Sequence, residues 1–188
     1  MKNKKLNIIN TYLDGLNIIE PNIYEDERGE FGRVFCEDEL SYIFKENNIK
    51  QVNHSITHKK GSVRGLHFQY SPNCEIKLIK CIKGKIIDIV VDIRKDSITF
   101  LKSFSVELSA ENKKMILIPK GFAHGFQTIE DDTELIYFHS EIYSPENEGA
   151  ISIFDPKLDI IFPLKVSDIS DKDKSHKYLD NYFKGIKI

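Results

Sequence analysis

Apolar and polar residues alternate with a period of two along much of the chain. In residues 87–94 every odd position is isoleucine or valine, whereas Asp88, Asp92 and Arg94 lie on the other face. Residues 104–108 repeat this alternation. Further strand-like segments span residues 51–57, 63–70, 75–82, 114–119, 134–143 and 150–154. The pattern therefore predicts a chain made mainly of short β-strands.

Turn-forming residues separate these strands, and helical periodicity is confined to two segments. Clusters that contain Gly, Pro, Asn or Asp fall at residues 59–61, 71–73, 83–85, 95–97, 130–132 and 145–147. Residues 38–47 and 172–184 carry apolar side chains at i, i+3, i+4 spacing and are predicted to be helices. We therefore predict one all-β domain over residues 1–188, a jelly-roll sandwich or barrel with short peripheral helices.

Composition and charge exclude several classes of protein. With 188 residues, 40% hydrophobic and 30% charged, the chain has the composition of a soluble globular protein. A net charge of -2 argues against a nucleic-acid partner, and the apolar runs are too short to span a membrane. No apolar stretch follows the basic residues 1–5, so no signal peptide is expected. Cys36, Cys74 and Cys81 lack CxxC spacing, which favours reduced thiols in the cytoplasm.

Two histidines occupy apolar, glycine-containing segments that resemble strands. His67 lies in residues 63–69 and His124 in residues 118–126. Imidazole is the side chain best suited to transfer a proton near neutral pH. One such histidine is by default a hydrogen-bonded core residue. Two of them, with Arg64 near the first and a Pro-x-Gly turn before the second, favour a functional site.

The strand that contains His67 raises a question about Arg64. His67 and Gln69 share one face of a regular strand, and Arg64 would lie on the opposite face. Gly65 is a position at which a β-bulge would turn Arg64 toward the histidine face; the alternative is a surface arginine. On the next strand Lys77 shares a face with apolar residues, so it lies either at a rim or in a site.

Other polar and aromatic residues are candidates for ligand binding, although packing and solvated loops are their ordinary explanations. Tyr137 and His139 share a strand face, and Gln51 and Asn53 place two amides on another. The remaining candidates are Tyr143, which precedes the segment 144–148, and the charged turn 26–31.

Taken together and in order, these segments resemble the dTDP-4-dehydrorhamnose 3,5-epimerase family, the RmlC-type cupins. The resemblance is carried by residues 26–29, 51–55, 64–69, Lys77, 119–126, Tyr137, 143–148, 155–156 and 169–173. It implies a jelly-roll cupin that forms a homodimer and works without a metal or other cofactor. It also implies inversion of the carbons flanking a ketone, C3 and C5, on a nucleotide-diphosphate sugar that serves surface polysaccharide synthesis.

The resemblance implies a catalytic role for four residues. His67 would be the base and Asp173 the carboxylate that orients it, although Asp171 lies only two residues away. Lys77 would stabilise the enolate oxygen, and Tyr137 would return the proton from the opposite face. These roles suit the chemistry, because a carbon next to a ketone is acidic and its inversion needs a base, an acid and a nearby cation.

The resemblance also implies substrate-binding residues. Arginine suits diphosphate, and the candidates for the diphosphate, sugar and nucleobase are Arg28, Phe31, Arg33, Gln51, Asn53, Arg64, His124, Tyr143 and Glu148. One departure concerns Arg33, which occupies a position where many members carry a ligand-contacting glutamate. Such a change of charge would alter which nucleotide or sugar is accepted.

Alternative functions keep the same fold. In one alternative the enzyme would invert only C3, and in another it would act on a GDP- or CDP-linked hexose or heptose; both would use the same base and acid. A metal-dependent cupin would use a His-x-His pair, but here the second position is Gln69; Glu75 and His124 would complete only a weaker set of ligands. A non-catalytic sugar-binding protein would need no acid opposite a base.

Overall fold

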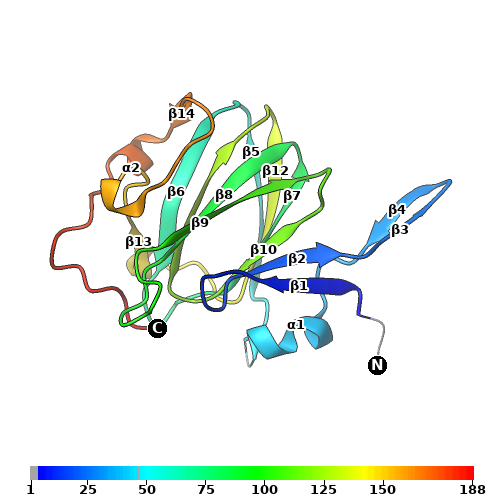
Figure 1. The fold of residues 1–188 in the computed structure, drawn as a ribbon, viewed down its shortest axis with the longest axis horizontal. Helices are drawn as coiled ribbons and strands as arrows, with labels where there is room; N and C mark the ends of the chain where they lie inside the picture. Colours follow the sequence, from blue (N-terminus) through cyan, green and yellow to red (C-terminus); the bar gives the residue numbers. More distant parts are fainter. Residues whose placement is uncertain (1–3, 46) are drawn as a thin grey trace.

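The computed structural model describes residues 4–45 and 47–188, and two antiparallel sheets form most of it (Figure 1). The first sheet has the strand order β1 (Leu6–Asn10), β2 (Asn17–Pro21), β10 (Met115–Ile118), β7 (Lys77–Lys83), β12 (Thr133–His139) and β5 (Gln51–Thr57). The second has the order β13 (Glu148–Ala150), β6 (Ser62–Gln69), β11 (Phe122–Thr128), β8 (Lys85–Asp92) and β9 (Ser103–Ser109). A short strand, β14 (Asp168–Ile169), pairs in parallel with β6.

Apolar side chains from both sheets meet between them. Ile79 and Leu135 of the first sheet pack in one cluster with Val90 and Phe126 of the second. Each such side chain contributes about 1.5–3 kcal/mol by leaving water. This inner core holds the two sheets together, and the predicted cupin-type β-sandwich is confirmed.

Other segments cover the two outer faces. Helix α1 (Glu37–Phe44) places Leu40 and Phe44 against the first sheet, and residues 151–186 pack on the outside of the second. These C-terminal residues include a single turn of 3-10 helix, Pro156–Leu158, and helix α2 (Asp171–Lys174); another such turn, Pro145–Asn147, precedes them. Because both faces of the second sheet are covered, Ile89 and Val91 on its outer side are fully buried.

Most of the predicted strands are confirmed with shifted ends, but two predictions are wrong. The strand predicted for residues 150–154 is absent, because β13 ends at Ala150 and residues 151–154 are irregular, and one predicted helix also fails. Helix α1 confirms the prediction for residues 38–47, of which residue 46 lies outside the described residues. The helix predicted for residues 172–184 ends at Lys174. Beyond it the chain runs along the second sheet in an irregular path, with Tyr178 and Tyr182 exposed. The aromatic spacing there reflects separate contacts, such as Phe183 stacked on Phe100, and not a helical face.

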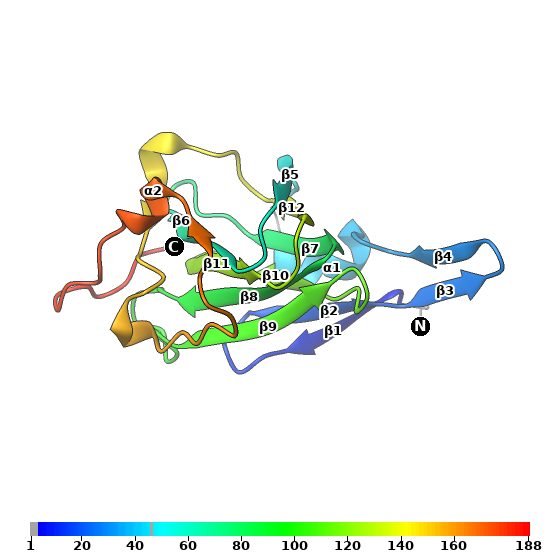
Figure 2. The same ribbon diagram turned by 90° about the horizontal axis from the view of Figure 1, so that it is seen from above.

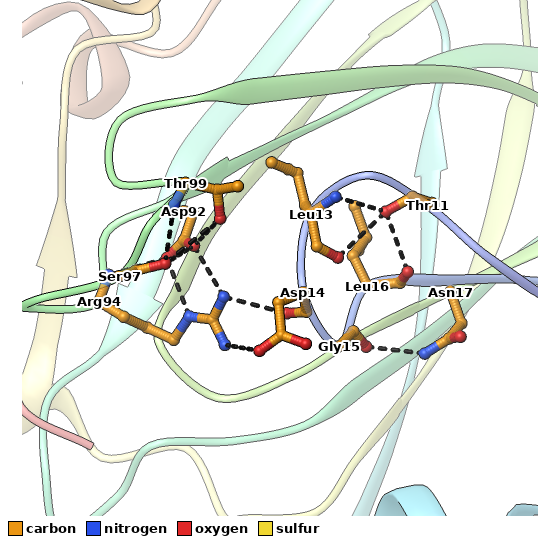
Figure 3. A network of polar contacts seen from close by, with 10 residues as sticks. All are labelled: Thr11, Leu13, Asp14, Gly15, Leu16, Asn17, Asp92, Arg94, Ser97 and Thr99. Carbon is orange, nitrogen blue, oxygen red and sulfur yellow. Dashed lines mark hydrogen bonds and ion pairs between the residues drawn. The ribbon is translucent and has the colours of Figure 1, made fainter.

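The polar side of residues 87–94 is buried, and Asp92 organises a network at its end (Figure 3). Asp92 accepts hydrogen bonds from Arg94, Ser97 and Thr99 at 2.6–2.9 Å, and Arg94 donates to the Asp14 carbonyl between β1 and β2. Burial by itself would raise the pKa of Asp92, but these hydrogen bonds outweigh it and the pKa is lowered. The network therefore ties the end of β8 to the first sheet.

A two-stranded arm, β3 (Ile23–Asp26) and β4 (Gly29–Gly32), projects beyond the sheets in both views (Figures 1 and 2). The arm exposes Phe31 of β4, of which 76% is accessible to solvent. Among the described residues no helix is long and apolar enough to cross a membrane. All three cysteines are free.

Candidate active site

An open cavity of about 540 Å³ lies between the two sheets. Its walls come from β5, β7 and β12 of the first sheet and from β6 and β11 of the second. The polar side chains that line it are Asn53, His54, Ser55, Arg64, His67, Lys77, His124, Tyr137 and His139. The sandwich thus gathers proton-transfer groups and cations from segments far apart in sequence.

His67 and Asp173 form a direct pair at this cavity. His67 Nε2 lies 2.8 Å from Asp173 Oδ1, and Asp173 Oδ2 accepts a longer bond from the Gly65 backbone N–H at 3.3 Å. Asp173 is almost fully buried, whereas about a third of the His67 side chain is exposed to solvent. Burial would raise the pKa of Asp173, but the hydrogen bond and charge of His67 outweigh it and the pKa is lowered. The carboxylate therefore fixes the tautomer of His67 and leaves Nδ1 as its basic nitrogen.

Helix α2 explains why Asp173, and not Asp171, makes this contact. Ser170 caps the helix, because its Oγ accepts a hydrogen bond from the Asp173 N–H at 3.0 Å. Strand β14, which precedes the helix, is paired with β6 and so carries the helix to His67. The Asp171 side chain is fully exposed and pairs with Lys174.

A β-bulge brings Arg64 to the same side as His67, which is one of the two alternatives that the sequence left open. His124 of β11 pairs with His67, but Phe126 pairs with Arg64, so two residues of β6 oppose the single Gly125. Gly65 adopts a φ of 114°, and a Cβ there would lie 2.5 Å from Gly125 Cα. Only glycines allow the two strands to approach this closely, and Arg64 consequently lines the cavity.

Glu75 connects Lys77 and His139 on the wall formed by the first sheet. Its Oε1 lies 3.1 Å from Lys77 Nζ and its Oε2 lies 2.8 Å from His139 Nδ1. All three side chains are about nine-tenths buried. Burial would raise the pKa of Glu75, but its partners lower it overall, so Glu75 is an anion that holds Lys77 and His139 in place.

Tyr137 lies on the same wall, across the cavity from the strand of His67. Its hydroxyl is 3.3 Å from Ser55 Oγ, and its ring stacks on His139 with centroids 6.0 Å apart. Burial raises the pKa of Tyr137, so the phenol stays protonated at neutral pH. A protonated phenol on this wall is suited to donate a proton.

His124 has a carboxylate partner of its own. Its Nε2 lies 2.8 Å from Asp88 Oδ2, and both side chains are almost completely buried. The Glu75–His124 pairing considered as a weak set of metal ligands is therefore absent, since each residue has a different partner.

At the mouth of the cavity, Tyr143 donates from its hydroxyl to Glu148, which also forms an ion pair with Lys172 at 2.7 Å. Gln51 accepts a hydrogen bond from the Tyr143 N–H, and its amide donates to Asn53. These side chains form one connected polar rim beside an aromatic ring. Such a rim is suited to a polar ligand with a planar base.

Three predicted binding residues lie on the arm or at its base, away from the cavity of their own chain. Arg28, in the turn of the arm, pairs with Asp26, and Phe31 lies in β4 opposite Tyr24. Arg33, at the base of the arm, forms an ion pair with Glu39 of helix α1. In this chain the arginine therefore anchors the arm to the body of the protein.

Sequence reasoning did not identify four residues of the site. Asp88 interrupts an apolar strand, and a polar residue there was a usable signal of a buried partner. Glu75 was considered only as a metal ligand, Lys172 was unassigned, and no pattern marked His176. His176 lies behind the His67–Asp173 pair, with its ring 5.5 Å from that of His67 and nearly perpendicular to it. Burial lowers the pKa of His176.

The chain is similar to known proteins over most of its length. The family model of dTDP-4-dehydrorhamnose 3,5-epimerase matches residues 10–181. The chain belongs to this family. The epimerase of Shigella flexneri is 39% identical over 95% of this chain and 99% of its own. The Legionella pneumophila RmlC structure, in complex with dTDP-4-keto-L-rhamnose, is 41% identical and covers 92% of both chains with a TM-score of 0.86. ChmJ of Streptomyces bikiniensis, a 3'-monoepimerase in complex with dTDP-quinovose, is 30% identical over 90% of this chain and 86% of its own, with a TM-score of 0.81.

Proposed function

We propose that this protein is an isomerase that inverts C3 and C5 of dTDP-4-dehydro-6-deoxy-D-glucose to give dTDP-4-dehydro-L-rhamnose. The observation that carries the proposal is the placement of His67, held by Asp173 at 2.8 Å, on one sheet and of Tyr137 on the opposing sheet. Inversion at carbon requires removal of a proton from one face and its return to the other. A cavity with a base on one wall and a protonated phenol on the other meets this requirement.

In this proposal His67 removes the proton next to the C4 ketone. The electron pair moves to the ketone oxygen and gives an enolate, and Lys77 stabilises the negative charge. Asp173 stabilises the imidazolium that results, as a buried carboxylate does beside a catalytic histidine. Tyr137 then delivers a proton to the opposite face of the same carbon.

Glu75 supports this step by binding two side chains of the cavity wall, Lys77 and His139. It holds the Lys77 ammonium group at the cavity through the 3.1 Å ion pair. His139, which is bound to the same carboxylate and stacked on Tyr137, is placed to help restore the proton of the phenol. The nucleotide would lie on the rim, with its base against Tyr143 and its diphosphate near Arg64 and Lys172.

We further propose a homodimer in which the arm of one copy reaches the cavity of the other. Arg28 and Phe31 are 84% and 76% exposed and lie away from the cavity of their own chain. A large exposed aromatic side chain on a projecting arm is the kind of residue that anchors a protein interface. The free cysteines are consistent with an enzyme of the cytoplasm.

Mixed dimers test this arrangement. His67→Asn and Arg28→Ala chains, each weakly active alone, are unfolded and refolded together. If the arm serves the partner, one cavity of the mixed dimer has an intact His67 and an intact arm, so activity returns to about a quarter of the wild-type level for statistical mixing. Failure to regain activity in a verified mixed dimer would show that the arm serves its own chain.

The substrate is tested with dTDP-, GDP- and CDP-linked 4-dehydro-6-deoxyglucose and product analysis by NMR. The proposal predicts turnover of the dTDP compound with inversion at C3 and C5. Inversion at C3 alone would support the function of a 3'-monoepimerase, and a preference for GDP or CDP would identify Arg33 as the first residue to examine.

A further inference from the structure

His176 adds a second imidazole to the His67–Asp173 pair. Its side chain is about nine-tenths buried, and its Nδ1 has no hydrogen-bond partner within the part of the chain that the structure describes. This Nδ1 lies 3.9 Å from Asp173 Oδ1, the oxygen that contacts His67. A buried polar atom without a partner is costly, so its position calls for an explanation.

The three groups have the chemistry and spacing of a zinc site. Their ligand atoms, His67 Nε2, Asp173 Oδ1 and His176 Nδ1, all lie within 4.8 Å of one another. Zn–N and Zn–O bonds are about 2.0–2.2 Å, so two ligands of one ion lie at most about 4.3 Å apart. Small side-chain rotations close the difference. Two imidazoles and one carboxylate favour Zn²⁺ over Mg²⁺ or Ca²⁺, which prefer oxygen ligands.

The surroundings suit an ion that enters and leaves. A second cavity, of about 340 Å³, is lined by both His67 and Asp173 and provides an entry path and space for a water as the fourth ligand. The Gly65 N–H binds the other oxygen of Asp173 and so orients the carboxylate as an outer-shell partner does. The other charged groups that face His176 are Lys172 and Glu148, which pair with each other.

We propose that Zn²⁺ binds His67, Asp173 and His176 and thereby inhibits the enzyme reversibly. The ion would take the lone pair of His67 Nε2, which must first give up its proton. That proton moves to Nδ1, and a protonated Nδ1 cannot accept one from the sugar. Zinc would therefore block the base that the proposed function requires, while catalysis itself needs no metal.

Direct binding measurements test the site independently of activity. Protein freed of metal with EDTA is titrated with Zn²⁺ by calorimetry and with Co²⁺ by visible absorption, with Mg²⁺ as a control ion. We expect one zinc per chain, and a dissociation constant that rises more than about tenfold in His176→Phe, which keeps the ring but loses the ligand. His58→Ala is the matched control, because His58 also lies 2.8 Å from an aspartate, Asp132, but on the surface. Equal zinc affinity in His176→Phe and the wild type, or no saturable binding, would overturn the site.

Two further measurements test the position of the bound zinc and its effect on activity. The first is NMR of the wild-type protein, which does not depend on the folding of any variant. Zinc should shift the ring signals of His67 and His176 but not those of His58. A shift of the His58 signals without a shift of the other two would refute the site. Zinc should also stop epimerisation by the wild type, with recovery on EDTA, whereas the activity that His176→Phe has without zinc should not change when zinc is added. Zinc that binds without slowing turnover refutes the inhibition, whereas a zinc-free enzyme without activity refutes the proposed function and leaves the binding result standing.

Discussion

His67 and His124 lie directly opposite each other on β6 and β11, and each has its Nε2 2.8 Å from an aspartate. The two histidine–aspartate pairs differ in how much of the histidine side chain is exposed to solvent. About 35% of the His67 side chain is exposed, against 7% for His124, whose partner Asp88 is completely buried. A base must reach the substrate carbon, so we propose His67, and not the more buried His124, as the proton acceptor.

Asparagine at each position distinguishes the two histidines. In His67→Asn, exchange of the sugar proton with solvent should fall by about 100- to 10,000-fold, because the base is lost. In His124→Asn exchange should persist, with a lower melting temperature because Asp88 loses its partner. NMR of the sugar in deuterated water measures the exchange, and thermal unfolding provides the control. Exchange lost in His124→Asn but retained in His67→Asn would reverse the assignment.

Tyr137→Phe separates proton removal from proton return. The variant keeps the ring and its stacking on His139 but has no proton to donate. We expect deuterium to enter the substrate while net inversion falls sharply, since the enolate still forms on His67. Tyr143→Phe, at the rim, serves as the control and should change KM more than kcat. Normal inversion by Tyr137→Phe would assign the acid role to another group, with His139 as the next candidate.

Gly65→Ala tests the bulge that turns Arg64 into the cavity. The new Cβ would lie 2.5 Å from Gly125 Cα and 2.7 Å from the His124 carbonyl, in a backbone conformation that suits glycine. We expect a loss of about 2–3 kcal/mol in the free energy of unfolding, measured with urea, and a large loss of activity. Gly29→Ala is matched in its positive φ but has no atom within 4 Å, so it should cost less. Equal effects would mean that the close approach of the strands is unimportant.

Much of the fold could be predicted because alternation identifies strands directly. Residues 51–57 match β5 at both ends. The bulge at Gly65 was predictable as well, since glycine between Arg64 and His67 is a local signal. The helix expected in residues 172–184 fails because a spacing of aromatic residues does not show which neighbours they contact. That segment contacts the second sheet, which lies about a hundred residues earlier in the chain.

The candidate site was predictable only in part. The pairing of His67 with Asp173 was expected from the family resemblance, and the structure shows the contact. The partners of His124 and Lys77 were not expected, because Asp88 and Glu75 are brought to them by strand pairing and by packing between strands. His176 depends on the path of the chain after α2, which no local pattern specifies.

The Asp92 network predicts a dependence of stability on pH. The pKa of Asp92 is lowered in the folded state, so its contribution is complete above the unfolded pKa, about 3.9, and is lost as the pH falls through the folded value. Asp92→Asn should therefore lose about 3 kcal/mol at pH 7 and progressively less below pH about 4, measured by urea unfolding. Asp96→Asn, an exposed aspartate of the same loop, should match the wild type at each pH. A pH-independent difference would refute the role of the Asp92 charge.

Incubation of the wild-type protein with dTDP-4-dehydro-6-deoxy-D-glucose in deuterated water tests the central claim most directly. NMR of the sugar reports deuterium and configuration at each carbon. The base on β6 and the acid on β12 predict deuterium at both C3 and C5, with inversion at both. An unlabelled sugar of unchanged configuration, under conditions in which the nucleotide is shown to bind, would contradict the account.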